Sequence, residues 1–489
     1  AVASAVSAEL GSPRASRNWP QWRGPLASGV APEAHPPIEW SEEKNIKWKV
    51  AIPGAGSASP IVWGDKVFIE TAIDTGKKSD KPADAAATSI SPRRAARFFL
   101  TADADTPDIA KPPSTQQAGP QEPAAAATGS MPPANPGAGP IGGKGGRGGM
   151  MGPKPENNFQ FVMLCLDRNT GTELWRRMVR EEVPHEGFRP NDGSFASSSP
   201  VTDGELVYAF FGSRGLYCFD MQGAPVWNKD FGQMQVKMAF GEGSSPALYG
   251  NVIIVNWDHE GESFITALDK RTGNELWRMP RDEKTSWATP IVATVDGKPQ
   301  VITAASSKIR AYDLADGKLI WECTGLGANA IPSPVVDGDT AYLTTGFRGS
   351  ILLAIRLGQT GDLSGTNAIL WKYDKDTPYV PSPLLFEGKL YIFKVNTNVL
   401  TCLDAKSGTA LYGPQRVDNL SDIYASPIAA DGRVYLIGRN GTTVVIRGGD
   451  KFEALATNKL DEGIDASPAL VDNEIFLRGK EHLYCIADK

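Results

Sequence analysis

A nine-residue phrase recurs along this chain, as DRNTGTELW at residues 167–175, DKRTGNELW at 269–277, DLADGKLIW at 313–321 and DAKSGTALY at 404–412. A second signature, a small residue followed by Ser or Thr and then Pro, occurs eight times. Its prolines are Pro60, Pro200, Pro246, Pro290, Pro334, Pro383, Pro427 and Pro468. After a first step of 140 residues, consecutive prolines are 41 to 49 residues apart. A period near 40 to 45 residues with short strands is typical of a β-propeller.

Each unit contains four short apolar segments separated by turn residues, as in SSPVTD, ELVYAFF, GLYCFD and PVWNKD from Ser198 onward. We therefore predict an all-β, eight-bladed propeller of four-stranded antiparallel blades. In the DxxTG turn, Asp and Thr can bond the turn amides while Gly takes a positive φ. The large residue that closes the phrase should pack between neighbouring blades; it is Trp in five units, at Trp175, Trp227, Trp277, Trp321 and Trp371.

The last unit has three candidate strands, so a fourth must come from elsewhere. The segment 45–50, NIKWKV, carries Trp48 at the outer-strand position and is expected to complete the last blade and close the ring. The propeller then comprises residues 18–72 and 159–489. The seventh unit lacks both the turn phrase and the Trp, so we expect its outer contact to be built differently.

Two segments lie outside this pattern. Residues 73–158 are rich in Ala, Pro, Gly and Ser, and we expect a mostly disordered insertion within the first blade. Residues 1–17 begin AVASAVSAEL, which resembles the end of a secretory signal peptide. They are either a signal-peptide remnant or a flexible terminus, and the first interpretation predicts an exported protein, periplasmic or extracellular.

Composition limits the partners. A net charge of −6 and a pI near 5.5 give no general attraction to phosphate backbones, so no nucleic-acid partner is expected. The longest apolar runs are too short to span a membrane. The five cysteines form no C-x-x-C or vicinal pair, and four of them fall at equivalent strand positions, which indicates buried core residues.

The small-Ser/Thr-Pro signature, the DxxTGxxLW phrase and the outer-strand Trp resemble the PQQ-like (pyrroloquinoline quinone) β-propeller repeat. NWPQWRGP near the N-terminus and WDHEGESFITALDKRTGNELWR further resemble exported bacterial members of that family. The resemblance implies the fold. The family includes both quinoprotein dehydrogenases and the non-enzymatic propeller of the outer-membrane assembly machinery, so function is left open.

A candidate site follows from strand order, because loops between blades and loops between second and third strands lie at the same mouth of the ring. We expect polar and aromatic side chains there to meet a protein or a small polar ligand. The candidates for contact with a ligand or cofactor are Trp287, Arg214, Arg348, Arg439, Asn329, Tyr379, Tyr424 and Asp465.

The sharpest local cluster is Asp258-His259-Glu260. Its carboxylates, with Glu242, are candidate ligands for a divalent ion, and His259 is a candidate general base. His185 and Asp258 are further catalytic candidates. The alternative is an exposed, hydrogen-bonded turn after strand NVIIVNW.

A quinoprotein dehydrogenase would, by resemblance, hold PQQ between a Trp and a vicinal disulfide, with Ca²⁺ bound by carboxylate and Asn side chains. Trp287 could lie beneath such a ring and Arg348 or Arg439 could pair with its carboxylates, yet the chain has no Cys-Cys pair and no matching calcium-ligand trio. We therefore rank a non-catalytic binding or scaffold module first and a PQQ-dependent oxidoreductase of alcohols or sugars second. A lyase or hydrolase acting on a sugar-like substrate through His185 or His259 is third.

Overall fold

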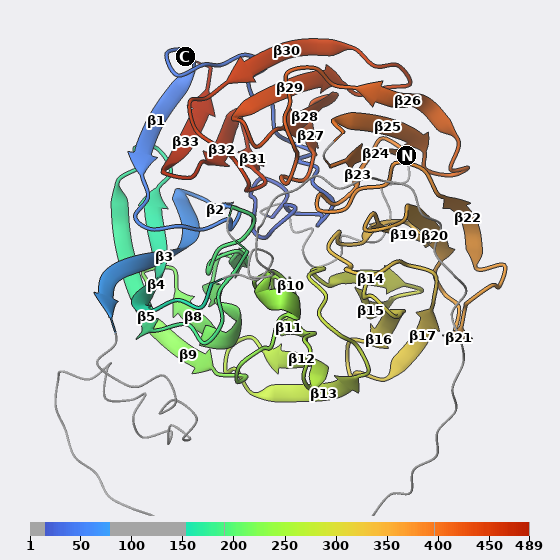
Figure 1. The fold of residues 1–489 in the computed structure, drawn as a ribbon, viewed down its shortest axis with the longest axis horizontal. Coiled ribbons are helices and arrows are strands. Elements are labelled where there is room, and N and C mark those ends of the chain that lie inside the picture. The colour runs from blue at the N-terminus through green and yellow to red at the C-terminus, as the bar shows by residue number, and fades with distance from the viewer. Residues whose placement is uncertain (1–14, 79–152, 190, 396, 489) are drawn as a thin grey trace, which may run out of the picture. The chain divides into compact units, whose positions relative to one another are not determined.

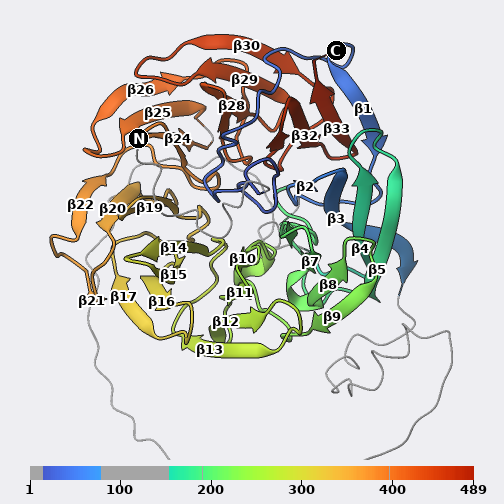
Figure 2. The same cartoon turned by 180° about the vertical axis from the view of Figure 1, so that it is seen from behind.

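The computed structural model describes residues 15–78, 153–189, 191–395 and 397–488. The chain divides into two units, and the second, Asp80–Gly149, lies wholly outside the described residues. The expectations for the insertion and for most of residues 1–17 therefore also fall outside them. The first unit forms eight β-sheets arranged around one axis (Figures 1 and 2), which confirms the predicted eight-bladed propeller.

Within each blade the strands follow one another outward from the axis. The bounds for blades 1 to 4 are β2 (Ile61–Trp63), β3 (Lys66–Lys78), β4 (Asn157–Asp167), β5 (Glu173–Glu182); β6 (Val201–Thr202), β7 (Leu206–Phe210), β8 (Leu216–Asp220), β9 (Pro225–Lys229); β10 (Ala247–Tyr249), β11 (Val252–Trp257), β12 (Ser263–Asp269), β13 (Glu275–Arg281); and β14 (Ile291–Val295), β15 (Lys298–Thr303), β16 (Ile309–Asp313), β17 (Leu319–Cys323).

The bounds for blades 5 to 8 are β18 (Val335–Asp337), β19 (Thr340–Thr345), β20 (Ile351–Arg356), β22 (Ile369–Tyr373); β23 (Leu384–Phe386), β24 (Lys389–Lys394), β25 (Val399–Asp404), β26 (Ala410–Arg416); β27 (Ile428–Ala430), β28 (Arg433–Ile437), β29 (Thr442–Arg447), β30 (Ala454–Lys459); and β31 (Ala469–Val471), β32 (Glu474–Arg478), β33 (His482–Ala487), β1 (Ile46–Ala51). Two short 3-10 helices, η3 (Gly212–Arg214) and η4 (Lys237–Ala239), lie in loops.

The N-terminal strand closes the ring as predicted. Strand β1 pairs antiparallel with β33, so that blade 8 contains both ends of the propeller chain (Figure 1). Trp48 of β1 is 8% exposed and its indole Nε1 donates to the carbonyl of Arg168 in blade 1 at 2.8 Å. Closure removes a free sheet edge and also links the last blade to the first.

Three details differ from the sequence-based expectation. Inner strands begin after the signature proline instead of including it, because Pro donates no ladder bond. Strand β3 continues to Lys78, whereas its expected end is residue 72, and strand β4 begins at Asn157, whereas its expected start is residue 159. Blade 4 gains a fifth strand, β21 (Gly361–Asp362), which pairs parallel to β17 and helps to bury Trp321 completely.

The Ser/Thr of the signature joins neighbouring blades. Its hydroxyl oxygen accepts a hydrogen bond from the backbone N–H at the same position of the preceding blade. The bonds run from Ser59 to Ser199 (2.9 Å), Ser199 to Ser245 (2.9 Å), Ser245 to Thr289 (3.0 Å), Thr289 to Ser333 (2.8 Å), Ser333 to Ser382 (2.9 Å), Ser382 to Ser426 (2.9 Å) and Ser426 to Ser467 (2.9 Å). We call this set the hydroxyl ring. The Ser or Thr of the signature is therefore not only small enough for the crowded ring centre but also joins neighbouring blades through its hydroxyl.

The DxxTG turns form the outer contact between blades. In blade 1, the Asp167 carboxylate accepts bonds from the amides of Asn169 (3.0 Å) and Thr170 (2.8 Å), and Gly171 has a φ of 72°. A Cβ on Gly171 would lie 2.9 Å from the Trp48 ring, so only Gly lets the two blades approach this closely. The predicted role of the phrase as architecture is confirmed.

The seventh blade uses a different outer contact, as its sequence predicts. Trp40, from the segment before β1, packs at 6.4 Å from the ring of Tyr435 in an approximately parallel arrangement. The backbone N–H of Trp40 donates to the side-chain oxygen of Asn458 at 2.8 Å, and the side-chain amide of Asn458 donates to the backbone carbonyl of Ile38 at 2.8 Å. The N-terminal segment thus supplies the aromatic surface that β30 lacks.

The N-terminal segment also crosses one end of the ring axis, at the centre of Figure 2. Trp19 forms a bridge with Val62 of blade 1, and the amide of Thr202 in blade 2 donates to Pro20. Farther along, Ala31 donates to Ala429 of blade 7. We call residues 19–34 the axial segment.

Removing one hydroxyl of the ring should destabilise the protein without changing the fold. In Ser245→Ala, the buried amide of Ser199 loses its acceptor, and we expect a loss of about 1–3 kcal/mol in the free energy of unfolding. Urea denaturation measures this loss. Thr360→Ala, which removes an exposed hydroxyl, is the control, and equal losses in the two variants would contradict the structural role of the ring.

Ring closure should be costly to disrupt. The Trp48→Ala substitution removes packing against Phe476 and blade 1. We therefore expect the free energy of unfolding to fall by about 3–5 kcal/mol. Leu276→Ala truncates an outer-strand side chain that is 52% exposed and should cost no more than about 0.5 kcal/mol. A Trp48→Ala variant as stable as Leu276→Ala in guanidinium unfolding would show that β1 does not close the ring.

Candidate functional site

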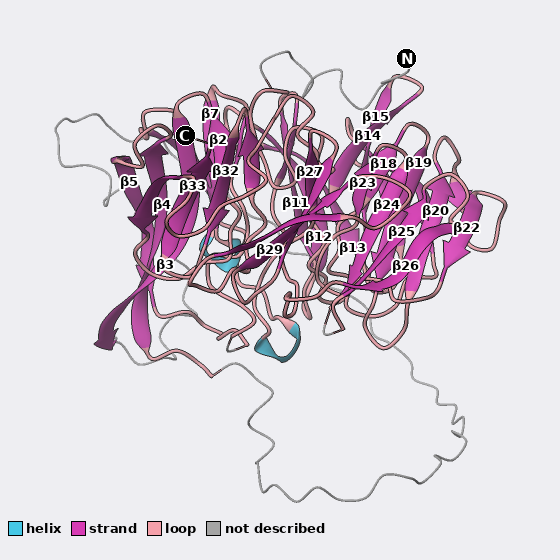
Figure 3. Cartoon of the chain, turned by 90° about the horizontal axis from the view of Figure 1, so that it is seen from above, coloured by secondary structure: helices cyan, strands magenta, loops and turns pink. Residues whose placement is uncertain are grey.

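The mouth of the ring lies at the lower side of Figure 3, the side toward which β3 and β4 extend. Two long loops cover it, residues 183–200 after blade 1 and residues 230–246 after blade 2. The first reaches across to blade 7, where the Asp192 carboxylate accepts from Arg439 Nη1 and from the Tyr424 hydroxyl, both at 3.0 Å. The mouth is therefore partly closed by the chain itself.

Three predicted contact residues, Arg439, Asp465 and Tyr424, form one cluster with Asp192 at the end of this loop. Arg439 is bonded to Asp465 at 2.6 Å and to Asp192 at 3.0 Å, and its guanidinium lies 4.0 Å from the centre of the Tyr424 ring. Burial acts to lower the pKa of Arg439, but the bonds to Asp465 and Asp192 outweigh it and raise the pKa. Two carboxylates already balance the charge of Arg439, so it is poorly placed to pair with a ligand carboxylate.

The second loop contacts the predicted residue Asn329, which in turn contacts the predicted residue Tyr379. Lys237 of η4 donates to the Asn329 side-chain oxygen at 2.9 Å, and the Asn329 amide lies 3.4 Å from the Tyr379 hydroxyl. Met238 and Ala239 in this loop have left-handed φ values of 52° and 50°. Such backbone is costly for residues other than Gly and often occurs at functional sites. Arg348 is exposed, with its guanidinium 5.3 Å from the ring centre of Phe347, and Phe347 in turn stacks on Tyr379 at 5.1 Å.

Two adjoining cavities lie beneath the loops, beside blades 2 and 3. Their volumes are about 370 Å³ and 300 Å³ including the openings to solvent, and Glu242 lines both. Arg214 lines the first, and Asp258 and Trp287 line the second. The structure therefore brings these four predicted residues together and leaves Arg348, Arg439, Asn329, Tyr379, Tyr424 and Asp465 outside both linings.

Arg214 is 3% exposed and lies between two aromatic rings and two carboxylates. Its guanidinium is 5.3 Å from the ring centres of both Phe161 and Phe195, and Nη1 donates to Glu242 at 3.2 Å. Nη2 has no hydrogen-bond partner among the described residues. It is a candidate donor to a polar group in the first cavity.

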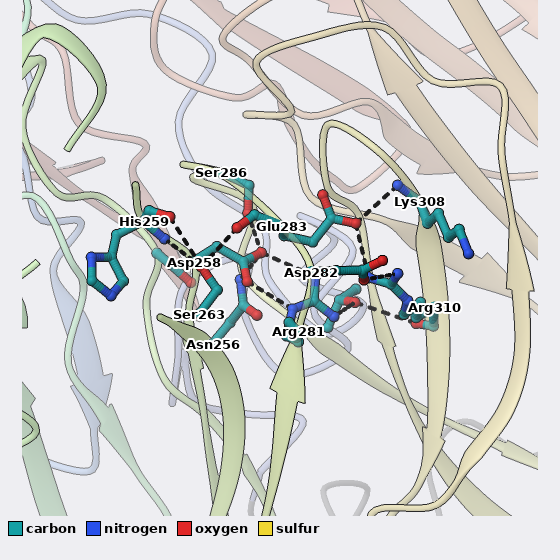
Figure 4. A network of polar contacts seen from close by, with 12 residues as sticks. Asn256, Asp258, His259, Ser263, Arg281, Asp282, Glu283, Ser286, Lys308 and Arg310 are labelled. Atoms are coloured by element: carbon teal, nitrogen blue, oxygen red, sulfur yellow. Dashed lines mark hydrogen bonds and ion pairs between the residues drawn. The ribbon is translucent and has the colours of Figure 1, made fainter. Parts of the chain in front are cut away.

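The Asp258 carboxylate is engaged on both oxygens (Figure 4). Arg281 donates from Nε at 2.7 Å and from Nη2 at 3.0 Å, Ser286 donates at 2.6 Å and Asn256 at 3.1 Å. Neither side chain of the Asp258–Arg281 pair is exposed. Burial acts to lower the pKa of Arg281, but the Asp258 charge outweighs it and raises the pKa. Asp258 is thus part of a buried ion pair, which the sequence did not reveal because Arg281 follows 23 residues later.

The network continues through Glu283, which is buried (Figure 4). Its carboxylate accepts from the amides of Ser307 and Lys308, both at 3.0 Å, and from Arg310 Nη1 at 2.9 Å. This part of the network escaped prediction. The charged run RDE at 281–283, directly after an outer strand, is the signal that could have indicated it.

His259 is buried and has both ring nitrogens bonded. Nδ1 lies 3.1 Å from the Gln235 amide and 3.2 Å from the Gly261 amide, so it accepts, and Nε2 carries the proton toward the Glu262 carbonyl at 3.0 Å. This geometry agrees with the hydrogen-bonded turn that the sequence left as an alternative, although Asp258 and His259 themselves are buried and only Gly261 and Glu262 of the turn are exposed.

The remaining candidates are also held by protein groups. His185 Nε2 lies 2.6 Å from the Met234 carbonyl, and Nδ1 is buried without a partner among the described residues. Glu260 accepts from the Thr285 hydroxyl at 2.8 Å. Within the described ranges, no three His, Cys, Asp or Glu side chains come together in a group that could hold a metal ion.

Eight blades with DxxTG turns, outer-strand Trp residues and polar mouth loops define a propeller of the PQQ-like repeat type. A family model described as outer membrane protein assembly factor BamB matches residues 160–411 and residues 265–489. These matches cover more than half of the chain, so the protein belongs to this family of PQQ-like propellers.

Two curated relatives carry the same description as the family model. The chain is 24% identical over 221 residues to outer membrane protein assembly factor BamB of Yersinia pestis, covering 41% of this chain and 53% of the relative. It is 26% identical over 212 residues to the protein of that name from Shigella dysenteriae, covering 42% and 49%. The match thus spans about half the length of these relatives.

Among solved structures, quinohemoprotein alcohol dehydrogenase from Comamonas testosteroni has a TM-score of 0.56 at 11% identity, covering 99% of this chain and 83% of that one. At this identity, the likeness shows the shared fold alone.

The Asp258–Arg281 pair should behave as structure. Arg281→Met leaves a buried carboxylate without its counter-ion, and we expect a loss of about 3–5 kcal/mol in unfolding free energy. The double variant Arg281→Met with Asp258→Asn should recover part of that loss. Arg278→Met, which breaks a more exposed pair with Glu275, should cost about 1 kcal/mol or less. Equal effects of Arg281→Met and Arg278→Met in urea unfolding would contradict this assignment.

Proposed function

We propose that this protein is an exported propeller that works as a binding or scaffold module, and that a partner protein docks on the loops at the mouth of the ring. The observation that carries the proposal is that the polar groups of the mouth bond mainly to one another. Arg439 is balanced by Asp192 and Asp465, Asp258 by Arg281, and His259 by backbone groups. Such an arrangement makes a preorganised surface.

Family membership supports the same proposal. The matched relatives are named as outer membrane protein assembly factors, a name that refers to assembly and not to a reaction. It also favours an exported location in the periplasm. Among the described residues, no helix is both long and apolar enough to cross a membrane.

The docking surface should centre on loop 230–246. Met238 is 38% exposed, and its backbone is held in an unfavourable conformation beside Lys237. The loop is fixed directly before Met238, because the Val236 amide donates to Glu186 at 2.9 Å and the Lys237 amide to Thr285 at 3.0 Å. An exposed apolar side chain on a fixed loop can dock with little loss of conformational entropy.

The alternative is a PQQ-dependent oxidoreductase, which the quinohemoprotein fold likeness brings into consideration. The residues at the mouth fit PQQ poorly. Trp287 lines a cavity, but Arg439 is paired with two carboxylates, and Arg348 lies apart from the cavity linings. The described residues also provide no group of three or more His, Cys, Asp or Glu side chains that could hold Ca²⁺. We therefore derive no reaction through this cofactor.

Incubation with PQQ and Ca²⁺ tests the alternative. We expect no quinone absorbance to remain with the protein after gel filtration, and no dye reduction with alcohols or sugars. Retained absorbance together with dye reduction would contradict the binding-module proposal.

Site-specific crosslinking tests the docking surface. A photo-crosslinking residue at position 238 should capture a discrete partner in the periplasmic fraction of the source organism, whereas the same residue at position 319 should not. Leu319 is the matched control because it is 49% exposed on the rim of the ring. With the purified partner, Met238→Glu should weaken binding at least tenfold and Leu319→Glu should not. Equal capture at both positions, or equal affinities of the two Glu variants, would contradict the proposal.

A further inference from the structure

The axial segment contains the motif NWPQWRGP, whose Arg23 no part of the proposed function uses. Arg23 is 2% exposed and has a left-handed φ of 70°. Its Nη1 donates to the carbonyl of Pro427 at 2.6 Å, and its Nη2 donates to that of Pro383 at 2.7 Å. These prolines belong to the signatures of blades 7 and 6, so the guanidinium lies at the ring axis next to the hydroxyl ring.

The charge of Arg23 lacks a carboxylate counter-ion among the described residues. A guanidinium has five N–H donors. Three bonds are made, the third from Nη2 to the carbonyl of Ser28 at 2.7 Å, and Nε has no partner. Burial lowers the pKa of Arg23 to about 9, and no neighbouring negative charge opposes this shift. A buried cation held only by carbonyl dipoles is costly.

Two further buried donors in the same segment have no hydrogen-bond partner among the described residues. They are the amide Nε2 of Gln21, which is 7% exposed, and the hydroxyl of Ser28, which is 9% exposed. Ser28 is next to Arg23 through the bond to its carbonyl, and Gln21 is two positions before Arg23. Buried donors are usually paired, so three unpaired donors of one segment indicate an acceptor that the protein itself does not provide.

We propose that Arg23, Gln21 and Ser28 form an inorganic anion site at the ring axis, and that chloride occupies it. Arg23 Nε and Gln21 Nε2 can only donate, and the Ser28 hydroxyl can donate as well, which suits an anion, whereas a guanidinium cation repels a metal cation. Gly29 packs closely against the guanidinium, where an added Cβ would lie 2.6 Å from it, so a monatomic anion suits this crowded position better than a polyatomic one. A bound anion balances the charge of Arg23 and strengthens the attachment of the axial segment to blades 6 and 7.

This site is independent of the mouth. The axial segment bonds to inner strands at the second residue after the signature prolines, as at Val62, Thr202 and Ala429, whereas the mouth loops precede those prolines. Failure of partner docking at Met238 would leave the anion site untouched, and failure of the anion site would leave docking untouched.

Bromide provides a direct probe. Crystals of the full chain grown in sodium bromide should show an anomalous difference peak within hydrogen-bonding distance of the Arg23 guanidinium. A density without anomalous signal at that place would show that water satisfies the donors, and would overturn the proposal.

Thermal unfolding tests the site in solution. At constant ionic strength, replacing gluconate with chloride should raise the melting temperature of the wild type by about 2–4 °C, because an anion bound only by the folded state stabilises that state. Arg23→Met should abolish this dependence. Arg17→Met changes an arginine of the same region that is 72% exposed, and it should retain the full chloride response.

Further variants and anions complete the test. If Arg23→Met does not fold, Gln21→Leu and Ser28→Ala should each reduce the chloride response at least twofold. Replacing chloride with formate tests whether a small carboxylate binds at the site. A rise in melting temperature with formate but not with chloride would overturn the assignment to an inorganic anion. An equal chloride response in the wild type and in all three site variants would also overturn the proposal.

Discussion

The backbone amide of the Ser or Thr before one inner strand donates to the hydroxyl of the Ser or Thr before the next inner strand, and the rest of the propeller depends on this contact. Inner strands are short, two to five residues, and start directly after a proline. They have little ladder pairing of their own, so the bond between blades satisfies an amide that would otherwise be buried and unpaired. Repeated around the ring, it keeps neighbouring blades at one radius.

Ring geometry in turn determines what lies at each end of the axis. At one end the axial segment crosses between blades and places Arg23 against the signature prolines. At the other end, the loops after blades 1 and 2 extend over the mouth, and Asp192 links blade 1 to blade 7. In the proposed function, these loops are the surface on which a partner docks. This arrangement favours docking over chemistry on a substrate inside the ring.

The parts that sequence analysis predicted well are those that repeat. Eight signatures and a near-constant spacing lead to eight blades, and Trp48 before the first signature leads to the closing strand. The turn phrase predicts its own hydrogen bonds because all its partners are within a few residues, as Asp167 and Thr170 show. Periodicity carries this information because each repeat meets the same neighbour.

The contacts that escaped prediction join segments that do not repeat. Asp258 and His259 look like an exposed acidic turn in sequence, yet Arg281 and the amide of Gln235 bury them. Arg439 and Asp192 are far apart in the chain and meet only because one loop spans the mouth. Strand β21 similarly comes from an insertion in blade 5 and covers blade 4. Strand order predicts which side chains lie at the mouth. It does not predict which of them bond to each other, because that depends on the conformations of loops that do not repeat in sequence.

Amide hydrogen exchange, followed peptide by peptide, tests the central claim most directly. If the ring is closed, residues 46–51 exchange as slowly as 482–487, and segments around the eight signatures share a similarly high protection. Rapid exchange in 46–51 beside a protected 482–487, or a block of unprotected signatures within the ring, would contradict a closed eight-bladed propeller and the mouth assembled on it.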